Sequence, residues 1–167
     1  MMQTVEIYIL NLIQKFRCPF LDAVMPKITM LGNCGAVWIV LAAVMYFSGY
    51  DEQAGMMVFV GLTVGVITGN LMLKPMVARP RPSWFIAEEN LLIKNPSDFS
   101  FPSGHTLSSF VSAFILISCG SFFGFAALFL ACAIAFSRMY LYVHYPSDIL
   151  GGILLAGMIS AGVLRCF

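Results

Sequence analysis

Three short polar segments interrupt an otherwise apolar chain, and their residue types suit chemistry at phosphorus. They are Lys74…Arg81-Pro82, Pro102-Ser103-Gly104-His105 and Ser137-Arg138…His144…Asp148. Charged and titratable groups are expensive in membrane helices, so clusters of this kind indicate a functional site. One histidine could attack phosphorus, the other could protonate the leaving group, and the cations could hold the oxygens.

The composition indicates an integral membrane protein. The chain has 167 residues, of which 60% are hydrophobic and 10% charged, and its mean hydropathy is +0.90. This balance is typical of a polytopic membrane protein, and the length fits one domain over residues 1–167. The net charge of +1 and the absence of a lysine or arginine run give no indication of nucleic-acid binding.

Apolar runs between polar breaks predict an all-α integral membrane fold, a bundle of six transmembrane helices. Residues 3–16 place apolar side chains at helical spacing on one face, which predicts an N-terminal amphipathic helix in the membrane interface. The alternative is a first span that continues past Lys15. The six spans are predicted over residues 19–32, 35–50, 54–73, 104–119, 122–138 and 147–165.

Counting these crossings places the three polar segments at one membrane face. Both termini and the Asp51-Glu52 turn then lie at the other face, which Lys15, Arg17 and Arg165 flank. The positive-inside rule makes that face cytoplasmic. We therefore expect a multi-pass protein of the plasma (inner) membrane whose site opens on the extracytoplasmic side.

Gly61, Gly65 and Gly69 form a stripe of small residues on the third predicted span. Such a stripe either packs closely against a neighbouring helix of the same chain or forms a dimer seam. We favour packing within the chain, and we expect a monomer or a weak homodimer.

His144 and Asp148 are four residues apart across a turn that Pro146 favours. Asp148 could accept the proton of one ring nitrogen of His144. That contact would fix the tautomer, free the other nitrogen for attack and stabilise a cationic phosphohistidine. The alternative is an interfacial histidine beside a helix-capping aspartate.

The segment Pro102-Ser103-Gly104-His105 precedes a predicted helix. Ser103 can cap that helix, and Gly104 lets a phosphate approach the backbone closely. The exposed N–H groups and the helix dipole then favour an anion beside His105. An ordinary helix cap is the alternative.

Lys74, Arg81 and Arg138 are candidates to hold the phosphate oxygens. Arginine offers a planar fork for phosphate, and lysine offers a point charge. The alternative is snorkelling at the membrane edge, which suits Lys74 alone better than three cations at the same face as two histidines.

Nothing in the sequence indicates a metal or another cofactor. No acidic cluster suggests a two-metal site, and two histidines with one nearby aspartate are a poor zinc set. A metal-free mechanism follows. Arg79, Lys94 and Asp98, which lie near the motifs, are interpreted as surface or supporting residues.

The chain resembles the type-2 phosphatidic acid phosphatase superfamily of membrane lipid phosphatases. The signatures of that family are met, in order, by Lys74, Arg81 and Pro82; by Pro102, Ser103, Gly104 and His105; and by Ser137, Arg138, His144 and Asp148. The matched region, residues 74–148, covers about half the chain. Soluble vanadium haloperoxidases share the motifs, but the hydrophobicity of this chain argues against that group.

The resemblance implies roles for the motif residues. His144 would be the nucleophile, Asp148 its partner and His105 the general acid. The resemblance also implies a set of phosphate ligands, namely Lys74, Arg81, Ser103, Gly104 and Arg138.

The resemblance further implies a metal-independent phosphatase, acting at the outer face on a lipid phosphate monoester or diphosphate. The substrate would be of the isoprenyl diphosphate, phosphatidylglycerol phosphate or phosphatidic acid type, and the short loop 83–101 favours a small headgroup. Its partners would be membrane lipids and this lipid phosphate. A lipid phosphotransferase with the same phosphohistidine is one alternative, and a non-catalytic lipid-phosphate binder or scramblase is the other.

Overall fold

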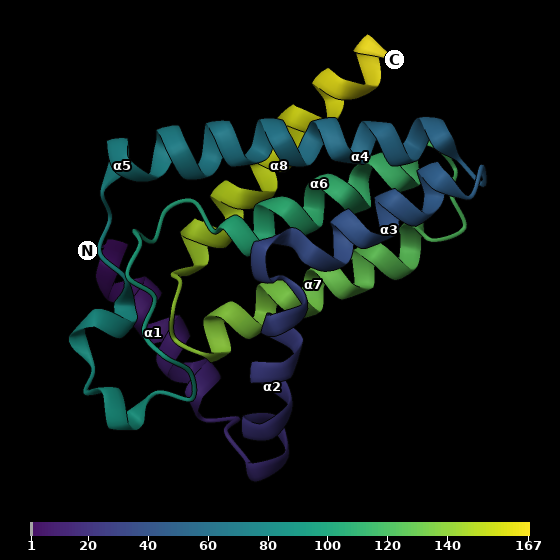
Figure 1. Cartoon of the computed structure of the whole chain (residues 1–167). Coiled ribbons are helices and arrows are strands. Elements are labelled where there is room, and N and C mark those ends of the chain that lie inside the picture. The colour runs from purple at the N-terminus through teal and green to yellow at the C-terminus, as the bar shows by residue number, and fades with distance from the viewer. Residues whose placement is uncertain (1) are drawn as a thin grey trace.

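The computed structural model of the protein describes residues 2–167, apart from the side chains of residues 2–4 and Glu88. Helices account for most of this part of the chain (Figure 1). The α-helices are α1 (Met2–Gln14), α2 (Pro19–Leu31), α3 (Ala36–Phe47), α4 (Glu52–Gly65), α5 (Lys74–Val77), α6 (Gly104–Ser118), α7 (Gly124–Tyr140) and α8 (Pro146–Cys166). Three short 3₁₀ turns and one π-helical segment, Val66–Leu73, complete the described elements.

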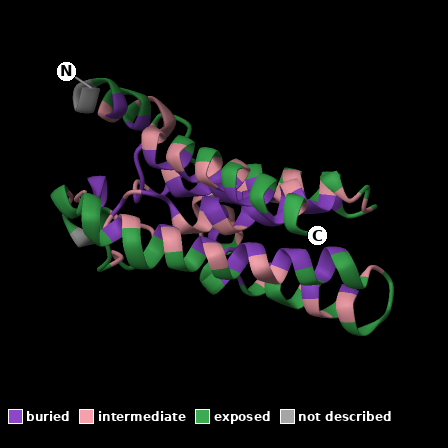
Figure 2. Ribbon diagram, turned by 90° about the horizontal axis from the view of Figure 1, so that it is seen from above, coloured by how far each residue is buried: buried purple, intermediate pink, exposed green. Residues whose placement is uncertain are grey.

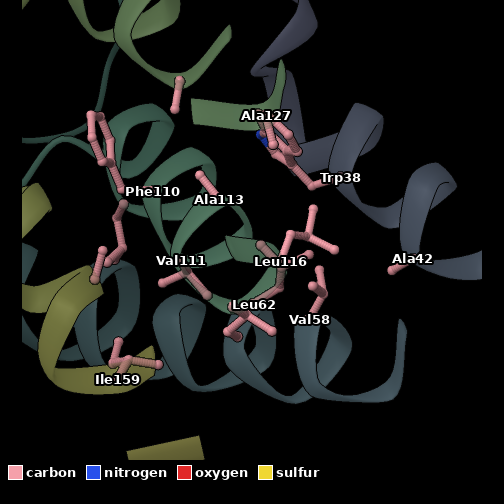
Figure 3. Packing of buried hydrophobic residues seen from close by; sticks show 14 of the residues in the cluster. Trp38, Ala42, Val58, Leu62, Phe110, Val111, Ala113, Leu116, Ala127 and Ile159 are labelled. Atoms are coloured by element: carbon pink, nitrogen blue, oxygen red, sulfur yellow. The ribbon is translucent and has the colours of Figure 1, made fainter. Parts of the chain in front are cut away.

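Helix α6 lies at the centre of the bundle and packs against α4, α7 and α8, while α3 packs against α4. The core between these helices contains fully buried side chains, among them Trp38, Val111 and Leu116 (Figure 3). The indole Nε1 of Trp38 donates to the Oγ of Ser109 at 3.0 Å, so the polar atom of this buried ring has a partner. The observed α6, α7 and α8 agree with the spans predicted over 104–119, 122–138 and 147–165.

The outward faces of the bundle are apolar. Buried residues line the inner sides of the ribbons and exposed residues line the outer sides (Figure 2). Large apolar side chains point outward from several helices, including Phe47 and Phe125, which are 83% and 78% exposed. Such surfaces suit hydrocarbon rather than water as the surrounding medium.

Helix length and hydropathy support a membrane protein but identify fewer spans than predicted. Among the described residues, Glu52–Phe85 and Pro146–Cys166 are each long and apolar enough to cross a membrane. The pair Pro19–Leu31 and Asn33–Phe47 qualifies only when taken together, with a 45° bend between its parts. Helices α6 and α7 are apolar but shorter, so the count of six transmembrane helices is not confirmed.

The glycine stripe of α4 faces the neighbouring helix α6. A Cβ added at Gly61 would lie 2.7 Å from Val111 Cγ1, and one added at Gly69 would lie 2.4 Å from Leu107 Cδ2. Both distances are shorter than a carbon–carbon contact, so a Cβ at either position would force the Val111 or Leu107 side chain to shift. The packing confirms that the stripe is used within the chain.

The helical stretch that begins at Glu52 continues past Lys74, where the sequence predicted it to end. It runs through the π-helical segment and α5 to Val77, and Ala78 then adopts a left-handed φ of 47°. Pro75 has no N–H to donate to the preceding turn, and a locally widened helix accommodates such a residue. Lys74 therefore lies one turn before the end of the helix, and its side chain is held by a rigid element.

Helices α3, α6, α7 and α8 and the α4–α5 stretch each run along the length of the bundle (Figure 1). Helix α2 does not add a further passage. The hydroxyl of Tyr140 donates to Asp22 at 2.6 Å, and Arg138 Nη1 donates to Thr29 Oγ1 at 2.7 Å. Asp22 and Thr29 lie near the two ends of α2, so both ends contact the same terminus of α7.

This difference moves the N-terminus to the end of the bundle where the three motifs lie. Gln14 of α1 donates to the carbonyl of Tyr140 at 2.8 Å, and Tyr142 donates to Asn11 at 2.9 Å. The C-terminus lies at the other end, where Gln53 donates to the carbonyl of Phe167. The prediction that both termini lie opposite the motifs is therefore wrong for the N-terminus.

Candidate active site

The three motifs meet at one end of the bundle around a cavity of about 610 Å³. Six of the eight predicted site residues line it: Lys74, Arg81, Gly104, His105, Arg138 and His144. Segments up to 70 residues apart in sequence thus converge, as the sequence predicted. The exposed side chain of Lys94 also lines this cavity.

Helix termini position these side chains. Lys74 lies at the end of the long α4–α5 stretch, His105 in the first turn of α6, and Arg138 in the last turn of α7. His144 lies in the short connection between α7 and α8. Because four elements end here, several polar backbone groups and charged side chains face one volume without interrupting a helix.

Arg81 fixes the tautomer of His144. The Nη1 of Arg81 lies 3.0 Å from the Nε2 of His144, and a guanidinium can only donate hydrogen bonds. Nε2 must therefore accept, and the ring proton is on Nδ1. Burial and, next, the positive charge of Arg81 lower the pKa of His144 well below its ordinary value, so the imidazole is neutral.

The Nδ1 of His144 faces the buried carboxylate of Asp148, but the contact is loose. Nδ1 lies 3.5 Å from Asp148 Oδ2 and 3.4 Å from the hydroxyl of Ser100. Ser100 itself donates to the same Oδ2, and the backbone N–H of Tyr145 donates to it at 2.8 Å. Asp148 thus caps α8 and faces His144 at once, so the two predicted interpretations of this aspartate both apply. Hydrogen bonds of this kind often tighten only with substrate.

Arg79 and Glu6 form a buried network behind Asp148 that the sequence analysis did not find. Arg79 Nη1 donates to Asp148 Oδ1 at 2.7 Å and to Ser147 Oγ at 2.6 Å. Its Nη2 donates to Glu6 Oε2 at 2.6 Å, and its guanidinium lies 4.1 Å over the ring of Tyr145. Arg79 is thus a supporting residue rather than a surface one, and through Arg79 the side chain of Glu6 joins helix α1 to Asp148.

We expect Glu6→Ala to destabilise the protein and to slow it. The substitution leaves a partly buried guanidinium with one carboxylate instead of two, and losing hydrogen bonds to a charged group costs about 1–3 kcal/mol. Thermal unfolding in detergent should show a lower Tm, and kcat should fall more than KM changes, because Asp148 loses its positioning. Asn11→Ala is the matched control, since it removes an exposed α1 contact outside this network. Equal behaviour of the two variants would contradict the assignment.

His105 has a partner from a distant segment. Its Nε2 lies 2.9 Å from the side-chain oxygen of Asn33, in the turn between α2 and α3. An amide oxygen only accepts, so Nε2 is protonated in this arrangement. This hydrogen bond orients the ring of His105 and places a proton on Nε2.

The three candidate phosphate-binding cations differ in the partners that their donor atoms already have. Lys74 and Arg81 both contact the carboxylate of Asp98. Arg138 donates through Nη1 to Thr29, but its buried Nε has no partner in the described structure. A buried donor without a partner is costly, and a bound anion would satisfy it.

Ser103 and Gly104 serve the start of α6 in different ways. Ser103 is fully buried and does not line the cavity, since its hydroxyl accepts hydrogen bonds from the backbone and the hydroxyl of Thr106. Its predicted cap is confirmed, but its backbone N–H already donates to the carbonyl of Asp148. Gly104 lines the cavity, and a Cβ there would lie 2.8 Å from the side-chain oxygen of Asn70.

A second, largely apolar groove of about 400 Å³ opens beside the cavity. It runs between α3, α4 and α6 and is lined by residues that include Ile39, Leu62 and Val66. Lys74, Asp98, Gly104 and His105 line both spaces. A molecule with a charged end and a hydrocarbon tail could therefore occupy both at once.

The fold and the site together define an all-helical protein of membrane type with a cation-lined cavity beside two histidines. The sequence model of the PAP2 superfamily matches residues 54–167, and the chain belongs to this family. It is similar to LpxE of Aquifex aeolicus, with a TM-score of 0.82, 25% identity, and coverage of 95% of this chain and 94% of that one. It is also similar to a transmembrane PAP2-type phosphatidylglycerolphosphate phosphatase from Bacillus subtilis, with a TM-score of 0.78, 27% identity, and coverage of 99% and 85%.

A curated relative adds a third comparison. The undecaprenyl-diphosphatase of Sulfolobus acidocaldarius is 29% identical over 125 residues, which are 74% of this chain. The chain spans 60% of the length of that relative.

Proposed function

We propose that the protein is a membrane phosphatase that hydrolyses a lipid phosphate monoester or diphosphate through a phosphohistidine. The observation that supports this most strongly is the state of His144. It is buried and neutral, its Nε2 is unprotonated, and it lies on the wall of a cavity that is also lined by two arginines and two lysines. An unprotonated ring nitrogen beside fixed cations suits attack on a phosphoryl group.

The proposed reaction has two displacements at phosphorus. His144 Nε2 attacks phosphorus, the bond from phosphorus to the leaving oxygen breaks, and the imidazolium form of His105 transfers its Nε2 proton to that oxygen, which leaves His105 as a neutral base. Water then attacks the phosphohistidine, His105 takes the water's proton, and inorganic phosphate leaves with the nitrogen–phosphorus bond broken. Lys74, Arg81 and Arg138 neutralise the oxygens in both steps, and Asp148 stabilises the cationic imidazole.

The apolar groove supports a lipid as substrate. A phosphate at His105 would place an attached hydrocarbon chain between α3, α4 and α6, where the lining is apolar. Relatives named undecaprenyl-diphosphatase and phosphatidylglycerophosphatase indicate an isoprenyl diphosphate or a glycerophospholipid phosphate as the substrate class. The proposal extends to the whole chain, residues 1–167, as one membrane phosphatase domain.

Purified protein tests the activity directly. We expect phosphate release from a panel of undecaprenyl diphosphate, phosphatidylglycerol phosphate and phosphatidic acid in detergent. The rate should persist in EDTA, and orthovanadate should inhibit by resembling the transition state. A rate that is lost with chelator and restored by magnesium or zinc would contradict the mechanism. Phosphate appearing on an added lipid alcohol rather than in solution would favour the phosphotransferase alternative.

We further propose that the site opens on the extracytoplasmic side of the plasma membrane. The family resemblance supports this side, but the charge argument for it no longer holds. Lys15 and Arg17 lie at the site end of the bundle, where Arg17 bonds to Asp22, and only Arg165 remains near the other end.

Cysteine labelling tests the fold and the orientation separately. On a background without the native cysteines, cysteines replacing Lys15 and Glu89 should behave alike, because both positions lie at the site end. A cysteine replacing Glu52 should behave oppositely. In intact cells, a membrane-impermeant thiol reagent should label positions 15 and 89 and leave position 52 unlabelled. Labelling of position 52 alone would show that the site opens on the cytoplasmic side. Labelling of only one of positions 15 and 89 would contradict the fold.

A further inference from the structure

Arg81 has no donor free for a substrate in this structure. Its Nε donates to the backbone carbonyl of Asp98 at 2.7 Å, and its Nη1 contacts the carbonyl of Val143 at 2.8 Å and His144 Nε2 at 3.0 Å. Its Nη2 donates to the Asp98 carboxylate at 2.7 Å and to the carbonyl of Phe99 at 3.3 Å. A guanidinium has five N–H donors, so all five are occupied.

The Asp98 carboxylate also contacts Lys74, so one anion neutralises two of the three cations. It is not a deeply buried structural group, because its side chain is 52% exposed, and it lines both the cavity and the apolar groove. Burial alone would raise the pKa of Asp98, but the hydrogen bond from Lys74 and the charge of Arg81 lower it to about 2. The carboxylate is therefore ionised at every working pH.

Arg138 presents the opposite case. It is 4% exposed, it forms no ion pair within the described residues, and its Nε is buried without a hydrogen-bond partner there. Arg138 can therefore bind an incoming anion directly, whereas Lys74 and Arg81 are already paired with Asp98.

We propose that the Asp98 carboxylate competes with the substrate phosphate for Lys74 and Arg81, so that a substrate must displace it in order to bind. The need for this displacement keeps the phosphodiesters of ordinary membrane lipids out of the site. The proposal rests on the proposed phosphatase function and adds a selection by charge. A monoanionic diester would replace the single negative charge of Asp98 beside Lys74 and Arg81 with another single charge, so it would gain little binding free energy. The dianionic end of a monoester or diphosphate adds a second charge that Arg138 can neutralise.

The physical basis of this selection is that the negative charge of Asp98 in the unliganded site opposes the binding of any anion. A ligand that binds only the state in which Asp98 is displaced has its affinity reduced by the fraction of molecules in that state. All anions are weakened, so weakly bound ones no longer occupy the site, while strongly bound ones remain. For an enzyme surrounded by diester lipids at high concentration, this reduction prevents occupation by the wrong headgroup.

The test compares wild type with Asp98→Asn, using inorganic phosphate and dimethyl phosphate as inhibitors in detergent. The amide keeps an oxygen that can accept from Arg81 Nη2, but it removes the competing charge. We expect both inhibition constants to fall about tenfold or more. Glu89→Gln, which removes an exposed charge from the same loop, should leave both constants unchanged.

The opposite sign would overturn the proposal. If Asp98 only positions Arg81, the amide should weaken phosphate binding or leave it unchanged. An equal tightening in Glu89→Gln would assign the effect to overall charge and would also overturn it. If neither wild type nor variant binds phosphate or orthovanadate at all, the proposed phosphatase function fails instead.

A measurement on wild type alone keeps the proposal testable should Asp98→Asn not fold. In nanodiscs, replacing neutral lipid by phosphatidylglycerol should leave the rate of wild type unchanged. Inhibition of wild type by phosphatidylglycerol that competes with substrate would contradict the exclusion of diesters.

Discussion

Replacing His144 with alanine should abolish the proposed hydrolysis of lipid phosphates. The substitution removes the only neutral ring nitrogen that faces Arg81 on the cavity wall in the described structure. Loss of a nucleophile commonly costs roughly 10⁴-fold or more in kcat. The measurement is phosphate release by purified variant and wild type at saturating substrate.

Phosphate binding should survive in the same variant, because the cations and the apolar groove remain. Orthovanadate should therefore still protect the His144→Ala protein against thermal unfolding, which separates lost chemistry from lost folding. Near-normal turnover by a folded His144→Ala protein would show that the nucleophile is another group.

Replacing His105 with alanine should reduce kcat by about 10²–10⁴-fold, in a way that depends on the leaving group. A lipid alkoxide or a prenyl phosphate needs a proton as it departs, whereas an aryl oxide such as 4-nitrophenolate does not. His105→Ala should therefore lose much more activity toward a lipid phosphate than toward 4-nitrophenyl phosphate.

The comparison with His144→Ala gives this prediction its control. The nucleophile variant should lose activity toward both substrates, since both need attack at phosphorus. If His105→Ala lost activity equally toward the two substrates, His105 would serve binding or structure rather than proton transfer.

Local features of the fold could be predicted from the sequence because neighbouring residues determine them. The Asp51-Glu52 turn is one example, and in the structure the side chain of Asp51 accepts the backbone N–H of Ala54 at 3.0 Å. The start of α6 at Gly104, after the Ser103 cap, is another. The convergence of the three motifs also followed from the sequence, because α6 and α7 were assigned nearly their observed bounds and the motifs lie at their ends.

The position of the N-terminus was wrong because an apolar run does not reveal its direction. Residues 19–31 form a helix of 13 residues, about 20 Å long at 1.5 Å per residue, against a hydrocarbon core of about 30 Å. Helix α2 therefore does not cross by itself, and it bends into α3 instead. Without a separate crossing by α2, the residues that precede α2, including Lys15 and Arg17, lie at the opposite end of the bundle from the one predicted.

The supporting residues of the site could not be predicted because tertiary packing brings them together. Glu6 reaches Arg79 across 73 residues of sequence, and Asn33 reaches His105 across 72. Asn70, which lies in the π-helical segment, is brought beside Gly104 of α6 by the packing of the two elements. None of these pairs has a spacing that indicates a contact, whereas the catalytic motifs have residue types that indicate chemistry by themselves.

Trapping the covalent intermediate tests the central claim most directly. Wild type would be mixed with substrate, quenched in alkali during turnover, and digested for mass spectrometry of the peptide that contains His144. The mechanism predicts an acid-labile, alkali-stable phosphate on His144 that forms and decays at the rate of turnover and is missing in His144→Ala. Turnover without any such phosphopeptide, or with the phosphate on another residue, would contradict attack by His144.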